Sequence, residues 1–271
     1  SYSKMREINM VFMVYILGGI ITGVLSAWVG AGGGAVIIPL MLFICKYQGI
    51  SNAIAIHLSV STSLGFIMIN ALYNAYKHYK HGHLITPLLK RAMPAILLGA
   101  IVGTIIGKML NARSIEILLI LLLLTSLIKT FSTQKASKQS ADSQLPSKLS
   151  CSIFGGLTGA LSSIVGVGGS SVVNPYMKHY HYPMKNCAAM SAALAFPIGL
   201  FATITMLISS YHIANLPAYS IGYLYLPAFL GLLIGSVIGT HIGVRIVKRC
   251  PERISLWLFR LILIFVIIDM L

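Results

Sequence analysis

The sequence predicts an all-α integral membrane protein, with about ten helical segments arranged as two inverted five-segment repeats. Three observations lead to this prediction. Of the 271 residues, 57% are hydrophobic and only 9% are charged, with a mean hydropathy of +0.87, whereas about 25% of residues are charged in an ordinary soluble domain. The apolar residues fall into long separate runs, and a glycine-rich motif followed by proline occurs once in each half of the chain.

The apolar runs form two sets of five. The first set covers residues 10–29, 35–47, 51–76, 85–108 and 114–131, and the second covers 149–166, 170–181, 185–211, 219–244 and 254–270. Between the sets, residues 132–148 are rich in Ser, Gln and Lys, a composition typical of a linker. We therefore divide the chain into a first transmembrane repeat at 1–131, a cytoplasmic linker at 132–148 and a second transmembrane repeat at 149–271.

The two halves repeat each other in sequence. The stretch from Gly30 to Pro39 aligns with the stretch from Gly166 to Pro175, and the pair Thr22 and Gly23 aligns with Thr158 and Gly159 at the same offset. At that offset the glycines of the fourth segment also match those of the ninth, Gly99, Gly103 and Gly107 with Gly235, Gly239 and Gly243. Matches that keep one register over separate sites indicate an internal duplication.

The distribution of charge predicts the orientation in the membrane. The chain has 20 Lys and Arg against 5 Asp and Glu, a net charge of +15. Most of the cations lie near 77–91, 129–148, 178–185 and 245–253, which the positive-inside rule places in the cytoplasm. Both termini then face outward, and the second half enters the membrane from the opposite face. Cations in such connections contact lipid headgroups, so we expect a lipid bilayer as partner and no nucleic acid.

The two glycine-rich breaks are the main candidate for a binding site. The run 35–47 would span about 20 Å as a helix, too short for a hydrocarbon core of about 30 Å, so the break before it must lie at membrane depth. Irregular backbone is tolerated there only inside the protein or along a watery cavity. A helix that starts after such a break presents N–H groups and a positive dipole end to an anion. The alternative is that the glycines only allow close helix packing.

The motif also resembles that of a known family. The pattern G-x-G-G-G, followed by an apolar run and Pro once in each half of an all-helical membrane protein, resembles the sulfite exporter TauE/SafE family over nearly the whole chain. The resemblance implies secondary transport of small sulfur-containing anions, such as sulfite or organosulfonates, across the cytoplasmic membrane. The second copy departs from the pattern at Ser170 and Asn174. Their extra donors leave another small oxyanion, such as a carboxylate or phosphonate, as an alternative substrate.

The predicted substrate site combines the two breaks with the polar start of the third segment. Its residues are Gly30, Gly32, Gly33, Gly34, Pro39, His57, Ser61, Gly166, Gly168, Gly169, Ser170, Ser171, Asn174 and Pro175. A histidine inside a predicted span, such as His57, is a functional candidate by default, although a neutral His bonded to a neighbouring helix is the alternative. The glycines of the fourth and ninth segments are attributed to helix packing instead.

Several motifs of other function classes are absent from the sequence. The acidic residues are Glu7, Glu116, Asp142, Glu252 and Asp269, and none lies in the middle of a predicted span, so a buried carboxylate site for a cation is not expected. The four cysteines show no metal-ligand spacing, and we expect neither a metal nor a cofactor.

Enzymatic activity is not expected either. The chain lacks a P-loop, a G-x-S-x-G elbow and an H-E-x-x-H motif. For an intramembrane enzyme, Ser61 or Ser170 near His57 is the one arrangement that the sequence offers. The sequence leaves two further questions open: whether the protein is an anion channel, and whether identical chains assemble into an oligomer.

Overall fold

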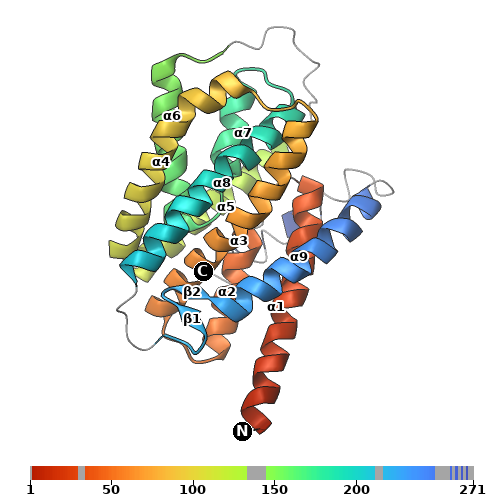
Figure 1. Cartoon of the computed structure of the whole chain (residues 1–271), viewed down its shortest axis with the longest axis vertical. Helices are drawn as coiled ribbons and strands as arrows, with labels where there is room; N and C mark the ends of the chain where they lie inside the picture. The colour runs from red at the N-terminus through yellow and green to blue at the C-terminus, as the bar shows by residue number, and fades with distance from the viewer. Residues whose placement is uncertain are drawn as a thin grey trace.

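The computed structural model describes residues 2–29, 34–132, 145–210 and 216–247, together with positions 257, 260, 261, 264 and 267. Nearly all of this part of the chain is α-helical (Figure 1). The first half contains α1 (Tyr2–Val29), α2 (Gly34–Tyr47), α3 (Asn52–Lys80), α4 (Thr86–Met109) and α5 (Ala112–Ser132). The second half contains α6 (Lys148–Val165), α7 (Ser170–His179), α8 (Met184–Ser209), β1 (Ser220–Ile221), β2 (Leu224–Tyr225) and α9 (Leu226–Val247).

The all-helical class is confirmed, and most helices begin and end within a few residues of the predicted runs. The run 219–244 is an exception, because β1 and β2 form an antiparallel hairpin and α9 begins only at Leu226. Positive φ angles at Tyr219 (67°) and Gly222 (54°) turn the chain there. Of the predicted segment 254–270, the structure describes single helical positions. The middle of the predicted linker, residues 133–144, lies outside the described residues.

In the described part of the chain, five helices have the length and hydropathy of a membrane span. They are α3, α4, α6, residues 185–209 of α8 and residues 226–243 of α9. Their outer faces expose large apolar side chains, among them Leu98 and Val102 on α4, Leu157 on α6 and Val237 on α9. So much exposed apolar surface suits contact with lipid rather than with water.

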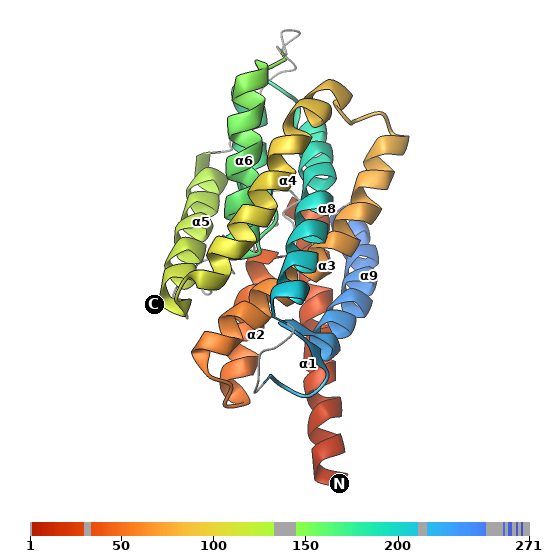
Figure 2. The same cartoon turned by 60° about the vertical axis from the view of Figure 1, so that its left-hand side comes forward.

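The helices of the two halves pair with one another across the molecule. Extensive contacts join α1 to α9, α4 to α6, and α3 to α8 (Figures 1 and 2). Gly23 of α1 packs on the backbone of Ser236 in α9, and its sequence counterpart Gly159 of α6 packs on the backbone of Ile96 in α4. The first helix of each half therefore pairs with the fourth helix of the other half, as the duplicated sequence would require.

The repeated glycines of α4 and α9 lie in these same interfaces. A Cβ on Gly103 would collide with the backbone of Ala160, and one on Gly239 with the backbone of Ile20. Close backbone approach through small residues is common where helices pack in membranes. The geometry thus agrees with the packing role expected for these glycines.

Corresponding helices of the two halves run in opposite directions. In Figure 2, α1 runs away from the end that holds the N-terminus, whereas α6 runs toward it. The α3–α4 turn and the start of α6 lie at the opposite end, where Arg91 donates a hydrogen bond to the carbonyl of Pro146 (2.7 Å) and Asn186 to that of His83 (2.8 Å). This course fits an inverted repeat, whose orientation in a membrane stays a prediction.

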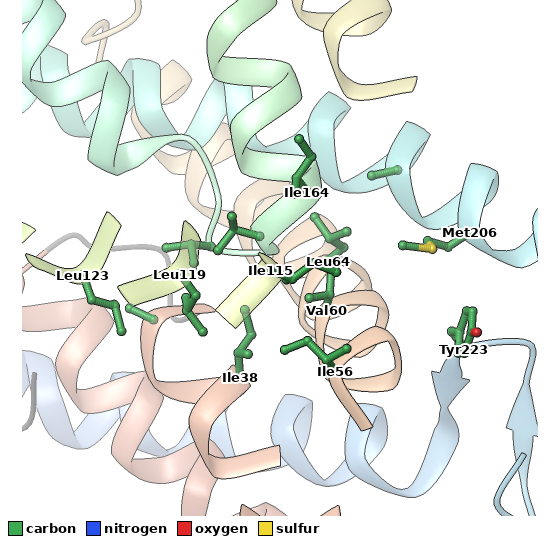
Figure 3. Close-up of a cluster of buried hydrophobic side chains, with 14 of the residues drawn as sticks. Ile38, Ile56, Val60, Leu64, Ile115, Leu119, Leu123, Ile164, Met206 and Tyr223 are labelled. Carbon is green, nitrogen blue, oxygen red and sulfur yellow. The ribbon is translucent and has the colours of Figure 1, made fainter. Parts of the chain in front are cut away.

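A buried apolar cluster fills the junction of α2, α3, α5, α6 and α8 (Figure 3). Ile38, Val60, Leu64 and Leu119 meet there, and Val167 of the connection between α6 and α7 belongs to the same cluster. The second glycine break is therefore buried in the interior of the bundle.

Candidate functional site: the two glycine breaks

The second break is a sharp interruption between two helices. α6 ends at Val165, and its C-cap Gly166 has a left-handed φ of 74° and donates its N–H to the carbonyl of Ser162 (2.8 Å). Gly168 has a φ of 75°, and Gly169 is the N-cap of α7. Left-handed backbone is readily accessible only to glycine, which explains Gly166 and Gly168. α7 has 10 residues, about 15 Å of helix, so it cannot cross a hydrocarbon core.

The described end of the first glycine motif, Gly34, contacts the second break. Gly30, Gly32 and Gly33 lie outside the described residues, but Gly34 is the first residue of α2. A Cβ on Gly34 would stand 2.5 Å from the carbonyl oxygen of Gly166 and 2.8 Å from the Cα of Val167. The start of the short helix α2 therefore touches the break that precedes the short helix α7.

Gly34 and the second break lie against the middle of α3, the longest described helix with the hydropathy of a span, at 29 residues. A Cβ on Gly166 would stand 3.1 Å from the Cα of Val60, and one on Gly34 would stand 3.1 Å from the Ile67 side chain. The Ser63 hydroxyl donates a hydrogen bond to the Gly166 carbonyl (2.7 Å). The interruptions thus lie midway along α3.

The start of α7 carries polar groups suited to an anion. The N–H groups of Val172 and Val173 both donate to the carbonyl of Gly169, so Ser170 and Ser171 supply the first N–H groups of the helix. Beside them on α6, Thr158 is fully buried and its hydroxyl has no hydrogen-bond partner. Its methyl group would lie 3.0 Å from a Cβ on Gly169.

The two halves differ at this position. Thr22 of α1, the counterpart of Thr158, donates its hydroxyl to the carbonyl of Gly18 in its own helix (2.8 Å). A buried polar atom without a partner in the protein is uncommon and indicates a position where water or a ligand binds. Of these two threonines, Thr158 therefore has the donor that a ligand would use.

The remaining predicted residues of α2 and α7 lie within the helices. Ser191 of α8 donates a hydrogen bond to the amide oxygen of Asn174 (2.9 Å), which joins α7 to α8. Pro175 lies inside α7, and Pro39 is buried inside α2. Neither proline has an N–H to offer a ligand, so their contribution is to helix shape.

His57 and Ser61 lie on α3 toward the end where the hairpin packs. The His57 ring lies 5.2 Å from the ring of Tyr223, and its Nδ1 has no hydrogen-bond partner. The Ser61 hydroxyl also has no partner and is fully buried. Burial raises the pKa of Tyr223 above its ordinary value, so this phenol stays protonated at neutral pH. His57 is one helical turn from Val60, on which Gly166 packs.

Sequence reasoning missed several polar residues of this region. Thr158 appears in the repeat, but nothing in the sequence indicates that its hydroxyl lacks a partner. Tyr223 lies beside His57 only because the hairpin returns to α3, which no local pattern predicts.

The groups that line the breaks are hydrogen-bond donors and helix starts. The described residues contain no group of three or more His, Cys, Asp or Glu placed to hold a metal. N–H groups, hydroxyls and the positive ends of helices stabilise negative charge. The described groups beside the second break therefore have the chemistry to stabilise a small anion.

A helical bundle with lipid-suited outer faces, in which the short helix α2 starts against an interior helix break, has the features of a membrane transporter. The chain belongs to the sulfite exporter TauE/SafE family, which it matches over residues 15–270. It is 26% identical to a probable membrane transporter protein of Haemophilus influenzae, over 81% of this chain and 83% of that protein. It is 25% identical to a probable membrane transporter protein of Methanocaldococcus jannaschii, over 84% of this chain and 83% of that protein. No solved structure matches the chain significantly.

Proposed function

We propose that this membrane transporter is a secondary transporter that exports small anions, such as sulfite or organosulfonates, across the plasma membrane by alternating access. The single observation that carries the proposal is the contact between the two breaks, in which Gly34 packs on Gly166 midway along α3. Two short helices thereby start near one place, and the unpartnered Thr158 hydroxyl lies beside one of them. Family membership supports the sulfur-containing class of substrate.

The anion would bind at the start of α7, held by the N–H group of Ser170 and by the hydroxyl of Thr158. Helix starts and charge-assisted hydrogen bonds offset the loss of the anion's hydration. The Ser61 hydroxyl has no hydrogen-bond partner, so it lacks the bond to a base that a serine nucleophile needs. This disfavours the arrangement of an intramembrane enzyme.

Purified protein in detergent tests the substrate class. A ligand of the folded state raises the melting temperature, so sulfite, thiosulfate, a sulfonate, a phosphonate and a carboxylate are compared at equal concentration. We expect the largest increase with sulfite or a sulfonate. Proteoliposomes then test the mechanism, since a carrier shows saturable uptake that is accelerated by substrate on the opposite side. Flux that rises linearly with concentration would indicate a channel instead.

A further inference from the structure

The interface between α3 and α8 contains three buried polar atoms without a hydrogen-bond partner. They are Nδ1 of His57, the hydroxyl of Ser61 and the hydroxyl of Thr203. Their residues are 8%, 0% and 5% exposed. Buried polar groups in native proteins are nearly always hydrogen-bonded, to protein or to ordered water. Three such atoms along one interface therefore point to water or a ligand between these helices.

Helix geometry places the three atoms along one line where α3 packs against α8, which we call the seam. His57 and Ser61 are four residues apart on α3 and share a face, which Leu64 and Met68 continue. Gly199 of α8 packs on the Leu64 carbonyl and the Met68 nitrogen, each 2.9 Å from its Cβ position. Thr203 is one turn beyond Gly199, and because α3 and α8 run antiparallel (Figure 1), this turn brings it toward Ser61.

The seam has a cationic end and leads to the second break. At the hairpin end, the Lys108 ammonium of α4 donates to the carbonyl of Ser209. The next residue, Ser210, accepts a hydrogen bond from the N–H of Tyr223, whose ring packs on His57. Toward the other end, Ser63 of α3 donates a hydrogen bond to the Gly166 carbonyl, and Val60 also contacts Gly166. The other described charges at the hairpin end, Lys46, Arg113 and Glu116, are exposed or half-buried.

We propose that the seam from Lys108 past His57, Ser61 and Thr203 to the second break is a hydrated path for a small anion. The identity of the anion rests on the proposed function, whereas the hydration of the path does not. Polar side chains without protein partners replace part of the water around the ion, and the ammonium at the entrance raises the local concentration of anions over cations. The seam is thus a second polar site, distinct from the helix start at Ser170.

Cysteine labelling tests the path. Cysteine is introduced as Ser61→Cys or Thr203→Cys in a background whose four natural cysteines are replaced. Each variant is treated in proteoliposomes with an anionic methanethiosulfonate that carries a sulfonate group. The matched control is Thr104→Cys, because Thr104 is equally buried but its hydroxyl is bonded to the carbonyl of Ala100 (2.7 Å). We expect the cysteines at 61 and 203 to react and the cysteine at 104 to stay unmodified.

The charge of the reagent tests the entrance. A cationic methanethiosulfonate should react more slowly than the anionic one, and Lys108→Gln should reduce this difference by about 10-fold. Arg113→Gln, which removes an exposed cation at the same end, should leave the difference unchanged.

The outcomes separate this proposal from the proposed function. Variants are compared only if they melt within a few degrees of the parent, and the two cysteine positions are scored independently. If both stay as unreactive as the cysteine at 104, the seam is dry and the proposal is wrong. If both react while the parent transports none of the tested anions, the path is supported and the proposed substrate class fails. Equal rates for the two reagents would overturn the anion-selective entrance.

Discussion

Gly34 and Gly166, which are far apart in the sequence, are in backbone contact: a Cβ on Gly34 would lie 2.5 Å from the carbonyl oxygen of Gly166. The same oxygen accepts the hydrogen bond from Ser63. One carbonyl therefore joins the start of α2, the end of α6 and the middle of α3. Any side chain at position 34 must displace backbone at this junction.

The first prediction concerns this contact. Gly34→Ala should destabilise the protein by about 1 to 3 kcal/mol, the usual cost of overpacking a site that cannot relax. Gly156→Ala is the control, because its Cβ would meet only the Ala95 carbonyl at 3.9 Å. Thermal unfolding in detergent measures both variants. If they melted at the same temperature, the close approach of the two breaks would be refuted.

The second prediction concerns the unpartnered hydroxyl beside α7. Thr158→Val keeps the shape of the side chain and removes the donor, so anion affinity should fall by about 10-fold to 100-fold if a charge-assisted hydrogen bond is lost. Thr22→Val removes a hydroxyl that is already bonded to Gly18 and should leave the affinity unchanged. Titration calorimetry with sulfite decides between them. Equal affinities in both variants would remove Thr158 from the site.

The third prediction uses the N-cap of α7. Gly169 has a φ of −65°, and its Cβ would meet only side chains, so Gly169→Ala should fold normally. The added methyl group would nevertheless push against Thr158 and crowd the first N–H groups of the helix. We expect an unchanged melting temperature without ligand and a smaller increase when sulfite is added. A full increase would show that the anion does not bind at the start of α7.

The fourth prediction concerns orientation. The positive-inside rule places Lys80 in the cytoplasm and the connection before the hairpin, which includes Ala218, outside. Both residues are exposed, so each can be replaced by cysteine in the cysteine-free background. An impermeant reagent applied to intact cells should label Ala218→Cys and spare Lys80→Cys. Labelling of Lys80→Cys alone would show the opposite orientation in the membrane. Labelling of both variants would contradict the predicted topology.

The helices were predictable from sequence because apolar runs and glycine breaks are local signals. The start of α2 at Gly34 and the N-cap at Gly169 both follow from the repeated motif. Local signals do not report which hydroxyls find partners after folding, so Thr158 and Thr203 could not be distinguished from Thr22 in advance. The hairpin at 220–225 was also hidden, because its residues carry no charge and run directly into the apolar helix that follows.

The packing glycines show a further limit of sequence reasoning. Gly103 and Gly239 were correctly attributed to helix contacts, but the sequence does not reveal how tight these contacts are. A Cβ at either position would overlap backbone of the partner helix. Replacing them by alanine would therefore damage the fold, and Gly156 is the better reference for a harmless substitution.

The pairing of α1 with α9, a helix of the other half, has a consequence for biosynthesis. α1 leaves the ribosome well before its main partner, α9, which begins only at Leu226. Until then the glycine-lined face of α1 lacks the helix on which it packs. The first half of the chain synthesised alone should therefore remain an assembly-incompetent intermediate subject to quality-control proteolysis. Co-expression of the second half as a separate polypeptide should protect it.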